Sequence, residues 1–198
     1  MSGNEKKLSF TFRMLRALGF NYSEEAYGQI SLFGVIRKFF ANFHKAFLCS
    51  MMNCWLFEPV LPRKMRPWIM RKCGCHVGKG CFIGDNVHFD SGHADMITLE
   101  DNVSIAGGSR LLCHQRDFSD YCVGDDYMKL GYTLKPIVLK KGCLIGMESF
   151  VMPGVTVGEG AIVGAGSMVT KDVPAWTVAI GRPAKVVRQI PNREEKQS

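Results

Sequence analysis

The sequence has no hydrophobic segment long enough to cross a membrane. The longest uncharged run in its N-terminal third is Ala46–Phe57, whereas a helix that spans a bilayer needs about 20 predominantly apolar residues. The first ten residues, MSGNEKKLSF, are polar and lack the apolar core of a cleavable signal sequence. We therefore expect a cytoplasmic protein without a transmembrane helix.

The sequence also lacks a recognised nucleic-acid-binding motif, although its formal net charge is +7 at pH 7. The basic residues are spread over the N-terminal part, the last third and the tail of the chain. A charge of this size calls for an anionic partner. We expect that partner to be a cofactor with several phosphates or an anionic membrane surface, and we expect no nucleic acid.

The cysteine pattern offers no metal site. Cys73 and Cys75 are separated by a single residue and have no matching second pair. Structural zinc sites use differently spaced pairs of ligands. We therefore expect that no metal ion is required.

What the sequence does contain is a repeat of six residues. Between residues 137 and 169 a large aliphatic residue recurs at every sixth position, and the residue two places before it is small or aliphatic. The large positions are Leu139, Ile145, Val151, Val157, Val163 and Val169, and the preceding ones are Ile137, Cys143, Ser149, Val155, Ala161 and Ser167. On an α-helix, which turns about 100° per residue, these positions would scatter around the axis. The repeat therefore excludes a helix.

In a strand, the large and the small position of each hexad point to the same side, into a core. Each hexad is then one short strand and one turn, and three turns close a triangular coil. Gly146, Gly158 and Gly164 follow the large residue, where we expect glycine to supply backbone freedom for the corner. Cys75 and Cys143 occupy the small inward position, as does Cys81, so we expect reduced thiols in the core.

The repeat begins near Cys75 and is interrupted twice. Four extra residues follow Phe89, in the stretch DSGHADMI, and predict a bulge at this corner of the coil. About 22 surplus residues lie between Leu111 and Leu139 and predict a long extruded loop at residues 112–136. Long insertions in repeat proteins collect on one face and often carry function.

The repeat and the closing segment VGAGSMVTKDVPAWTVAIGRPAKVVRQI resemble those of the hexapeptide-repeat acyltransferases, among them the sugar, polysaccharide, maltose and galactoside O-acetyltransferases. The resemblance implies a mainly β protein built around a left-handed parallel β-helix, with acetyl-CoA as the acetyl donor. It also implies a homotrimer whose active sites lie between adjacent coils. We expect an N-terminal helical arm at residues 1–70, the β-helix at 71–178, and a C-terminal cap with a basic tail at 179–198.

The resemblance further implies that His114, at the base of the extruded loop, is the catalytic residue. Histidine suits a general base because its pKa lies near neutrality. It would deprotonate an acceptor hydroxyl that attacks acetyl-CoA directly. Asp117 or Asp120 is a candidate to orient the imidazole, with a backbone carbonyl as the alternative, and Asp117 is also a candidate for substrate binding. Asp90 is the other substrate-binding candidate, and an ordinary turn aspartate is its alternative.

The closing segment corresponds to the part of similar enzymes that binds CoA. Its small residues would leave the backbone open to the pantetheine arm, and its basic residues would bind the nucleotide phosphates. The expected CoA site consists of Gly146, Met147, Ala165, Gly166, Thr170, Lys171, Arg182, Lys185 and Arg188. Leu144 and Met147 depart from the residues that are common in the family.

Residues and resemblance together predict transfer of an acetyl group to a hydroxyl group of a saccharide, such as a polysaccharide precursor or a lipid-linked sugar. An N-acetyltransferase of amino sugars and an acetyltransferase of antibiotics are the alternatives within the family. A zinc-dependent carbonic anhydrase on the same coil would instead use His88, His93 and His114. A scaffold without catalysis is the remaining alternative.

The helical arm leaves two interpretations open. The segment FGVIRKFFANFHKAFLCSMMNCWLFEPVL mixes basic residues with a dense apolar face. It either packs against the coil or a neighbouring subunit, or it lies at a membrane interface and makes residues 35–72 a peripheral anchor at the inner face of the membrane. A basic cluster follows, formed by Arg63, Lys64, Arg66, Arg71 and Lys72. This cluster is either a solvated face or a contact for anionic headgroups or a diphosphate-linked acceptor.

Overall fold

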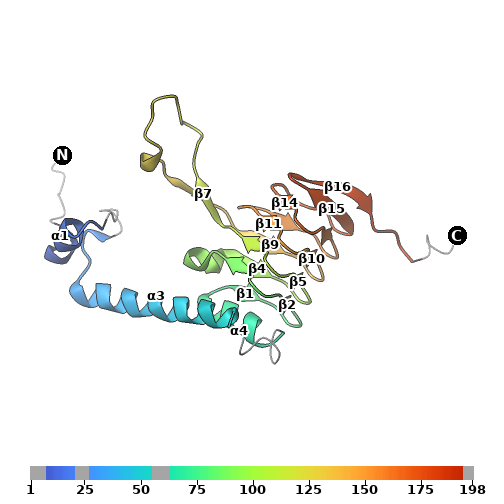
Figure 1. The fold of residues 1–198 in the computed structure, drawn as a ribbon, viewed down its shortest axis with the longest axis horizontal. Helices are drawn as coiled ribbons and strands as arrows, with labels where there is room; N and C mark the ends of the chain where they lie inside the picture. The colour runs from blue at the N-terminus through green and yellow to red at the C-terminus, as the bar shows by residue number, and fades with distance from the viewer. Residues whose placement is uncertain (1–7, 21–26, 55–62, 194–198) are drawn as a thin grey trace, which may run out of the picture. The chain divides into compact units, whose positions relative to one another are not determined.

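The computed structural model describes residues 8–20, 27–54 and 63–193 (Figure 1). Residues 1–7, 21–26 and 55–62 of the expected arm and 194–198 of the expected tail lie outside the described residues. The chain divides into two compact units, Met1–Phe47 and Leu48–Ser198. The first unit contains α1 (Phe10–Ala17) and most of α3 (Leu32–Met52). The second begins with the last turns of α3 and contains α4 (Met65–Cys73) and all the strands.

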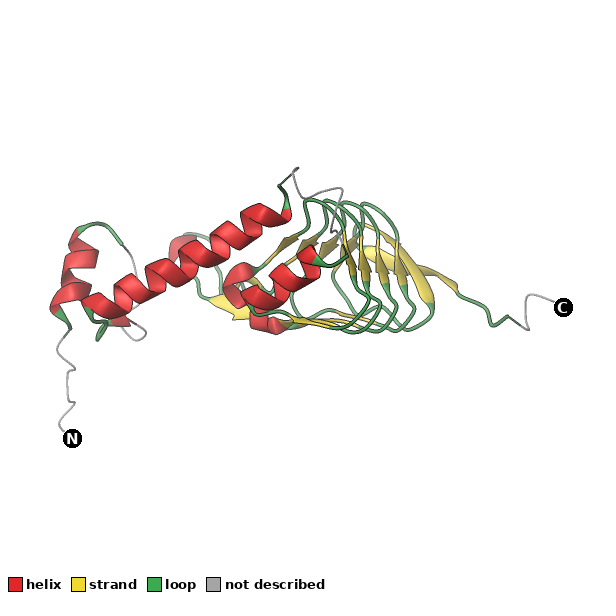
Figure 2. Cartoon of the chain, turned by 90° about the horizontal axis from the view of Figure 1, so that it is seen from below, coloured by secondary structure: helices red, strands yellow, loops and turns green. Residues whose placement is uncertain are grey.

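The second unit is a parallel β-coil made of three sheets, as the six-residue repeat predicts. The first sheet contains β1 (His76–Val77), β4 (Ile97–Leu99), β9 (Ile137–Leu139) and β12 (Thr156–Val157). The second contains β2 (Phe82–Ile83), β5 (Ser104–Ile105), β10 (Leu144–Ile145), β13 (Ile162–Val163) and β15 (Thr177–Gly181). The third contains β3 (His88–Phe89), β6 (Arg110–Leu111), β11 (Phe150–Val151) and β14 (Met168–Val169). Figure 2 shows the coils stacked so that equivalent strands and corners lie over one another.

The inward side chains of the coil form its core. The large residues of the repeat, among them Leu139, Ile145 and Val163, are fully buried, and so is the small residue Cys143. The inward serines Ser109, Ser149 and Ser167 are buried as well, and the first two donate hydrogen bonds to glycine carbonyls of the adjacent coil. An example is Ser109, whose Oγ donates to the Gly146 carbonyl at 2.9 Å. The predicted alternation of inward and outward residues is confirmed.

The corner glycines have a different role from the one predicted. Gly146 and Gly158 do not adopt positive φ; a Cβ at these positions would lie 2.5 Å and 2.4 Å from backbone nitrogens of the next coil. Glycine is therefore required because adjacent coils approach closely, and not because the corner needs backbone freedom. Positive φ occurs instead at the residue just before the small inward position, as at Gly142 (67°), Gly160 (62°) and Glu148 (55°).

Both interruptions of the repeat carry structure of their own. The bulge after β3 is the short 3₁₀ helix η2 (Ser91–Met96). The extruded loop is a hairpin in which β7 (His114–Arg116) pairs antiparallel with β8 (Tyr132–Leu134), and its outer part contains the 3₁₀ turn η3 (Tyr127–Lys129). Sequence reasoning predicted the insertion but not this pairing, because each strand is only three residues long.

The coil ends in a second hairpin. The strand β15 is the last parallel strand of the second sheet, next to β13. The following strand, β16 (Ala184–Gln189), turns back and pairs antiparallel with β15 at the edge of this sheet. Because β16 is antiparallel, it ends the series of parallel strands in this sheet.

Part of the basic cluster in and before α4 is structural. Arg66 is buried, and its guanidinium donates from Nε to the Met52 carbonyl at 3.0 Å and from Nη1 to the Ile83 carbonyl at 3.3 Å. Arg71 donates to the carbonyls of Val77 and Gly78 in the first coil. For the buried Arg66, both interpretations of the cluster, a solvated face and a ligand contact, are therefore wrong. Arg71 is exposed, and like Arg66 it joins α4 to the start of the coil.

The close approach of adjacent coils predicts a specific sensitivity to added methyl groups. A Cβ at Gly84 would lie 2.5 Å from the backbone nitrogen of Gly107, whereas a Cβ at Gly131, outside the coil, would meet nothing within 4 Å. We expect Gly84→Ala to lower the free energy of unfolding by about 1–3 kcal/mol, because the backbone of the next coil must shift. Gly131→Ala should change it by less than about 0.5 kcal/mol. Urea unfolding of the two variants at equal protein concentration tests this, and equal stability would contradict the stacking argument.

Candidate active site

The candidate site is built at the corner that follows the third sheet. Asp90 comes directly after β3, and His114 comes three residues after the end of β6. The strands β3 and β6 are neighbours, with Phe89 paired to Leu111, and the Asp90 amide donates to the Leu111 carbonyl at 3.1 Å. Because every coil passes the same corner, two residues that are distant in the sequence lie side by side.

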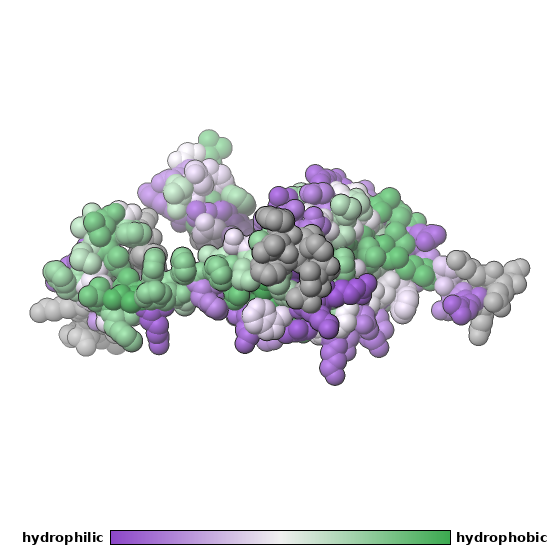
Figure 3. Space-filling model, turned by 60° about the horizontal axis from the view of Figure 1, so that its bottom comes forward, coloured by the Kyte–Doolittle hydropathy of each residue, from purple (hydrophilic) through white to green (hydrophobic). Residues whose placement is uncertain are grey.

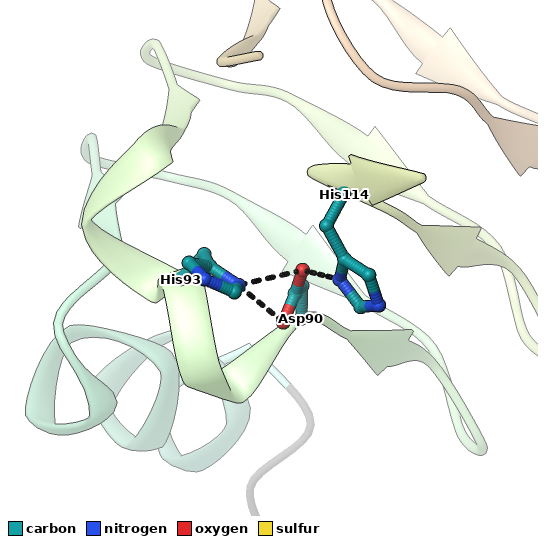
Figure 4. A network of polar contacts seen from close by, with 3 residues as sticks. All are labelled: Asp90, His93 and His114. Carbon is teal, nitrogen blue, oxygen red and sulfur yellow. Dashed lines mark hydrogen bonds and ion pairs between the residues drawn. The ribbon is translucent and has the colours of Figure 1, made fainter. Parts of the chain in front are cut away.

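Asp90 and His114 form a hydrogen-bonded dyad (Figure 4). Oδ2 of Asp90 lies 2.5 Å from Nδ1 of His114. The Asp90 side chain is 7% exposed, whereas that of His114 is 41% exposed. The second ring nitrogen of His114, Nε2, points away from Asp90. The carboxylate is thus held inside the corner while the imidazole reaches the surface.

A second histidine contacts the same carboxylate. His93, which lies in η2, places its Nδ1 3.3 Å and 3.2 Å from the two oxygens of Asp90. The ring centroids of His93 and His114 are 5.6 Å apart. Asp90 is therefore fixed by η2 on one side and by the start of the extruded hairpin on the other. Sequence reasoning named His93 only as a metal ligand and missed this contact.

The charge of Asp90 is stabilised by the two imidazoles. Burial by itself would raise the pKa of the Asp90 carboxyl, but the hydrogen bonds and charges of His114 and His93 outweigh it and lower this pKa below its ordinary value. The carboxylate therefore remains an acceptor at neutral pH. Burial, followed by the negative charge of Asp90, raises the pKa of the adjacent Cys113 thiol to about 11, so this thiol stays protonated.

This geometry defines the chemistry of His114. A carboxylate only accepts hydrogen bonds. Nδ1 of His114 therefore carries a hydrogen atom and donates a hydrogen bond to Asp90. The neutral ring then has its lone pair on Nε2, which points away from the carboxylate. An imidazole in this tautomer can take a proton from a substrate, and the ionised Asp90 stabilises the imidazolium that results.

The extruded hairpin forms one wall of the site. The ring of Tyr132, on β8, packs edge-on against His114 with centroids 5.5 Å apart. The Arg116 guanidinium lies 4.2 Å from the centroid of the same tyrosine ring and donates to the Leu130 carbonyl. Tyr132 was not among the predicted site residues. Only the antiparallel register of β7 and β8, which places Tyr132 opposite Arg116, brings it next to His114.

Asp117 does not orient the His114 imidazole. Its Oδ1 accepts hydrogen bonds from the backbone N–H and the hydroxyl of Ser119, at 3.0 Å and 2.7 Å. These bonds lower the pKa of Asp117. The group that holds Nδ1 of His114 is Asp90, so the interpretation that gave this task to Asp117 or Asp120 is wrong. Substrate binding by Asp117 stays a prediction.

Asp90, His93 and His114 are also close enough to hold a metal ion, since their potential ligand atoms lie within 4.8 Å of one another. Both Nδ1 atoms, however, approach the same carboxylate at hydrogen-bonding distances, and an ion would have to replace these hydrogen bonds with contacts of about 2.0–2.2 Å. The carbonic-anhydrase alternative requires three histidines. His88 does not belong to this cluster, which favours the interpretation of Asp90 and His114 as a proton-transfer dyad.

Five of the residues predicted to bind CoA lie at the neighbouring corner, which follows the second sheet. Gly146 and Met147 follow β10, Ala165 and Gly166 follow β13, and Arg182 follows β15. They contact one another: the Gly166 amide donates to the Met147 carbonyl at 2.7 Å, and Nε of Arg182 donates to the Gly166 carbonyl at 2.6 Å. The side chains of Met147 and Arg182 are exposed.

The other four lie apart from this group. Thr170 and Lys171 are exposed directly after β14, at the corner that also carries Asp90 and His114 in other coils. Lys185 and Arg188 are exposed on the edge strand β16. The structure therefore does not gather all nine residues in one place, and their common role in binding CoA stays a prediction.

The outer face of the third sheet connects the two corners and adds a residue that sequence reasoning missed. The guanidinium of Arg110, on β6, lies 5.1 Å from the centroid of the Phe150 ring, and that of Arg182 lies 5.6 Å from it. Phe150 pairs in register with Arg110. Two positive charges are thus held beside one aromatic ring. The outward position of Arg110 in its hexad could have indicated this.

Comparison with known proteins gives a consistent result. Residues 136–171 match the family model described as bacterial transferase hexapeptide (six repeats). The chain is 32% identical over 143 residues to a galactoside O-acetyltransferase of Lactococcus lactis, covering 65% of this chain and 69% of that protein. It is 38% identical over 117 residues to a Schizosaccharomyces pombe protein named as an acetyltransferase, covering 59% of this chain and 54% of that protein. The chain thus spans about half the length of several curated relatives that it matches.

A solved structure shares the fold. A galactoside acetyltransferase in complex with coenzyme A superimposes with a TM-score of 0.58 at 22% identity, covering 85% of this chain and 88% of that chain. At this identity the likeness concerns the fold alone. It agrees with the three parallel sheets described above.

The ionised Asp90 carboxylate should make the free energy of unfolding depend on pH. The folded-state pKa of Asp90 is lowered, so its charged contacts stabilise the protein above the unfolded-state pKa of about 3.9, and this contribution is lost as the pH falls through the folded-state pKa. We expect Asp90→Asn to lower the free energy of unfolding by about 1–3 kcal/mol at pH 6. The difference from wild type should shrink below about pH 4.

Urea unfolding over a pH series measures this difference. Asp120→Asn, at an exposed position of the extruded hairpin, is the control and should follow wild type throughout. A deficit in Asp90→Asn that is equally large at pH 6 and pH 3 would show that the lost contribution is not that of an ionised carboxylate.

Proposed function

This chain belongs to the family of hexapeptide-repeat acetyltransferases, and we propose that it transfers an acetyl group from acetyl-CoA to a hydroxyl group of a saccharide. Membership rests on the match to the galactoside O-acetyltransferase, of which the chain covers more than two thirds. The observation that carries the proposed mechanism is the dyad, in which buried Asp90 holds Nδ1 of half-exposed His114 at 2.5 Å.

In the proposed reaction His114 acts first as a base and then as an acid. Nε2 takes the proton of the acceptor hydroxyl while the hydroxyl oxygen attacks the thioester carbonyl carbon. The tetrahedral intermediate collapses, the carbon–sulfur bond breaks, and Nε2 returns the proton to the departing thiolate. The products are the O-acetylated acceptor and free CoA, and the enzyme carries no covalent intermediate.

Asp90 supports both steps. As an ionised carboxylate it fixes the tautomer of His114 and stabilises the imidazolium that exists between the two proton transfers. His93 holds the same carboxylate from the opposite side. We assign the oxyanion to a backbone N–H of a neighbouring coil, a contact worth about 3 kcal/mol in comparable sites.

The proposed donor site runs along the corner that follows the second sheet. The small residues Ala165 and Gly166 would let the pantetheine arm approach this corner, and Arg182, Lys185 and Arg188 would contact the phosphates through charge-assisted hydrogen bonds. The guanidinium of Arg110 beside Phe150 adds a positive charge on the sheet between this corner and His114. A bound coenzyme A in the structurally similar galactoside acetyltransferase supports this part of the proposal.

The proposed acceptor is a saccharide because the relative that shows the family membership is named for its action on galactosides. We further propose a left-handed coil, a homotrimer with its active sites between subunits, and a place in the cytoplasm at the inner face of a membrane. The basic, aromatic arm and the net charge of +7 support the last point.

The assignment of His114 predicts a large loss of turnover on substitution. We expect His114→Ala to reduce acetyl transfer by about 100-fold or more, because the acceptor hydroxyl loses its base, while CoA still binds. Release of free thiol from acetyl-CoA, measured with galactose, maltose, glucose and an amino sugar as acceptors, gives the rate. His76→Ala, at an exposed histidine of the first sheet, is the matched control. Turnover of His114→Ala near that of wild type would refute the mechanism.

The donor site predicts a change in binding that needs no acceptor. We expect CoA and acetyl-CoA to bind the purified protein in calorimetry. Lys185→Ala should weaken binding by about 10- to 100-fold, since a charge-assisted hydrogen bond is worth about 1.5–3 kcal/mol. Lys79→Ala, at an exposed lysine of another corner, should leave binding unchanged. If neither ligand binds wild type, the acetyl-CoA proposal fails. If Lys79→Ala binds CoA as weakly as Lys185→Ala does, the placement of the phosphates on β16 fails.

A further inference from the structure

The first unit carries a stripe of exposed aromatic side chains along α3. Phe33, Ile36, Phe40, Phe43 and Phe47 recur at spacings of three and four residues, so they lie on one face of the helix. Phe33 is 74%, Phe40 63% and Phe43 62% exposed. Figure 3 shows hydrophobic residues gathered along the helical arm. Such a contiguous apolar face marks a binding surface.

This stripe is not the face that packs within the first unit. Another face of α3 carries Val35 and Asn42, which line a small cavity together with Leu15 and Phe20 from the chain before it. Packing inside the unit therefore uses a different side of the helix. The aromatic stripe is left for a partner outside the chain's first unit.

The charge of the first unit indicates the chemistry of that partner. Residues 1–47 contain seven basic residues, Lys6, Lys7, Arg13, Arg16, Arg37, Lys38 and Lys45, and three acidic ones, Glu5, Glu24 and Glu25. The helix α3 itself contains no aspartate or glutamate. Arg37 adjoins the aromatic stripe on the helical wheel, whereas Lys45 lies on nearly the opposite side of the helix. Packing α3 of a second copy on this face would bring like charges together, because α3 has no acidic residue. An anionic surface would meet both the apolar stripe and the positive charge.

We propose that this face binds the surface of a bilayer that contains anionic phospholipids. No helix among the described residues is long and apolar enough to span a membrane, so α3 would lie in the plane of the interface. Its phenylalanines would enter the boundary between headgroups and acyl chains, and its basic residues would contact lipid phosphates. This inference does not depend on the proposed reaction, although it would hold the enzyme close to lipid-linked acceptors.

Vesicle binding by the full chain tests the proposal. In flotation assays we expect binding to phosphatidylcholine vesicles that contain phosphatidylglycerol, weaker binding to phosphatidylcholine alone, and release by high salt. Phe40→Ser/Phe43→Ser should lower the partition coefficient at least tenfold on both vesicles, since it removes buried apolar area. Arg37→Gln should lower it about fivefold on the anionic vesicles only, which corresponds to about 1 kcal/mol for one basic residue.

A matched control distinguishes binding by this surface from nonspecific binding by exposed aromatic residues elsewhere in the chain. Phe118→Ser/Tyr121→Ser removes two exposed aromatic residues of the extruded hairpin and should leave vesicle binding unchanged. Absence of wild-type binding to the anionic vesicles would overturn the proposal. So would a change in oligomeric state of Phe40→Ser/Phe43→Ser, seen by analytical ultracentrifugation without a change in vesicle binding, since the face would then join copies of the chain.

A second measurement does not rely on removing the aromatic side chains. In Phe43→Trp, the new indole should be quenched by phosphatidylglycerol vesicles with brominated acyl chains, after subtraction of the wild-type signal. A new tryptophan that remains unquenched while the protein is bound would show that another part of the chain makes the contact, and would overturn the assignment to α3.

Discussion

The backbone hydrogen bonds between successive coils are the constraint on which the whole molecule depends. Each strand has only two or three residues in the coil proper, so its stability comes from the ladder that it shares with the coils before and after it. The Gly84 amide, for example, donates to the Ile105 carbonyl at 2.7 Å, and the Gly146 amide to the Val163 carbonyl at 2.8 Å. This spacing keeps every corner in register and leaves no room for side chains where coils touch.

The same constraint places the candidate site. Because corners stack, Asp90 and His114 meet although 24 positions separate them in the sequence. The insertions then complete what the regular coil cannot provide: η2 brings His93 to the carboxylate, and the extruded hairpin brings Tyr132 to the imidazole. The hydrogen bonds between coils thus fix the positions of Asp90 and His114, while η2 and the extruded hairpin supply the residues that surround them.

The sequence predicts the coil well because its period is carried by side chains that are buried one hexad after another. It also locates both insertions and His114, since each is defined by a break in that period. It misses Asp90 as the partner of His114 because their contact depends on which corners stack, and a count of residues along one coil does not contain this. It assigns the wrong reason to Gly146 because a close approach between coils and a positive φ both select glycine.

The two hydrogen bonds that Asp90 accepts from His93 and His114 explain why its buried charge is tolerated at the corner after β3. A carboxylate at a site that is 7% exposed loses most of its hydration, and this loss must be offset by donors. Asp90 finds them in two imidazole N–H groups from different insertions, so neither insertion alone satisfies it. The proton on each Nδ1 is thereby committed to Asp90, and each ring presents Nε2 to its surroundings as an acceptor. The need to keep one buried charge hydrogen-bonded is therefore the same condition that prepares His114 to accept a proton.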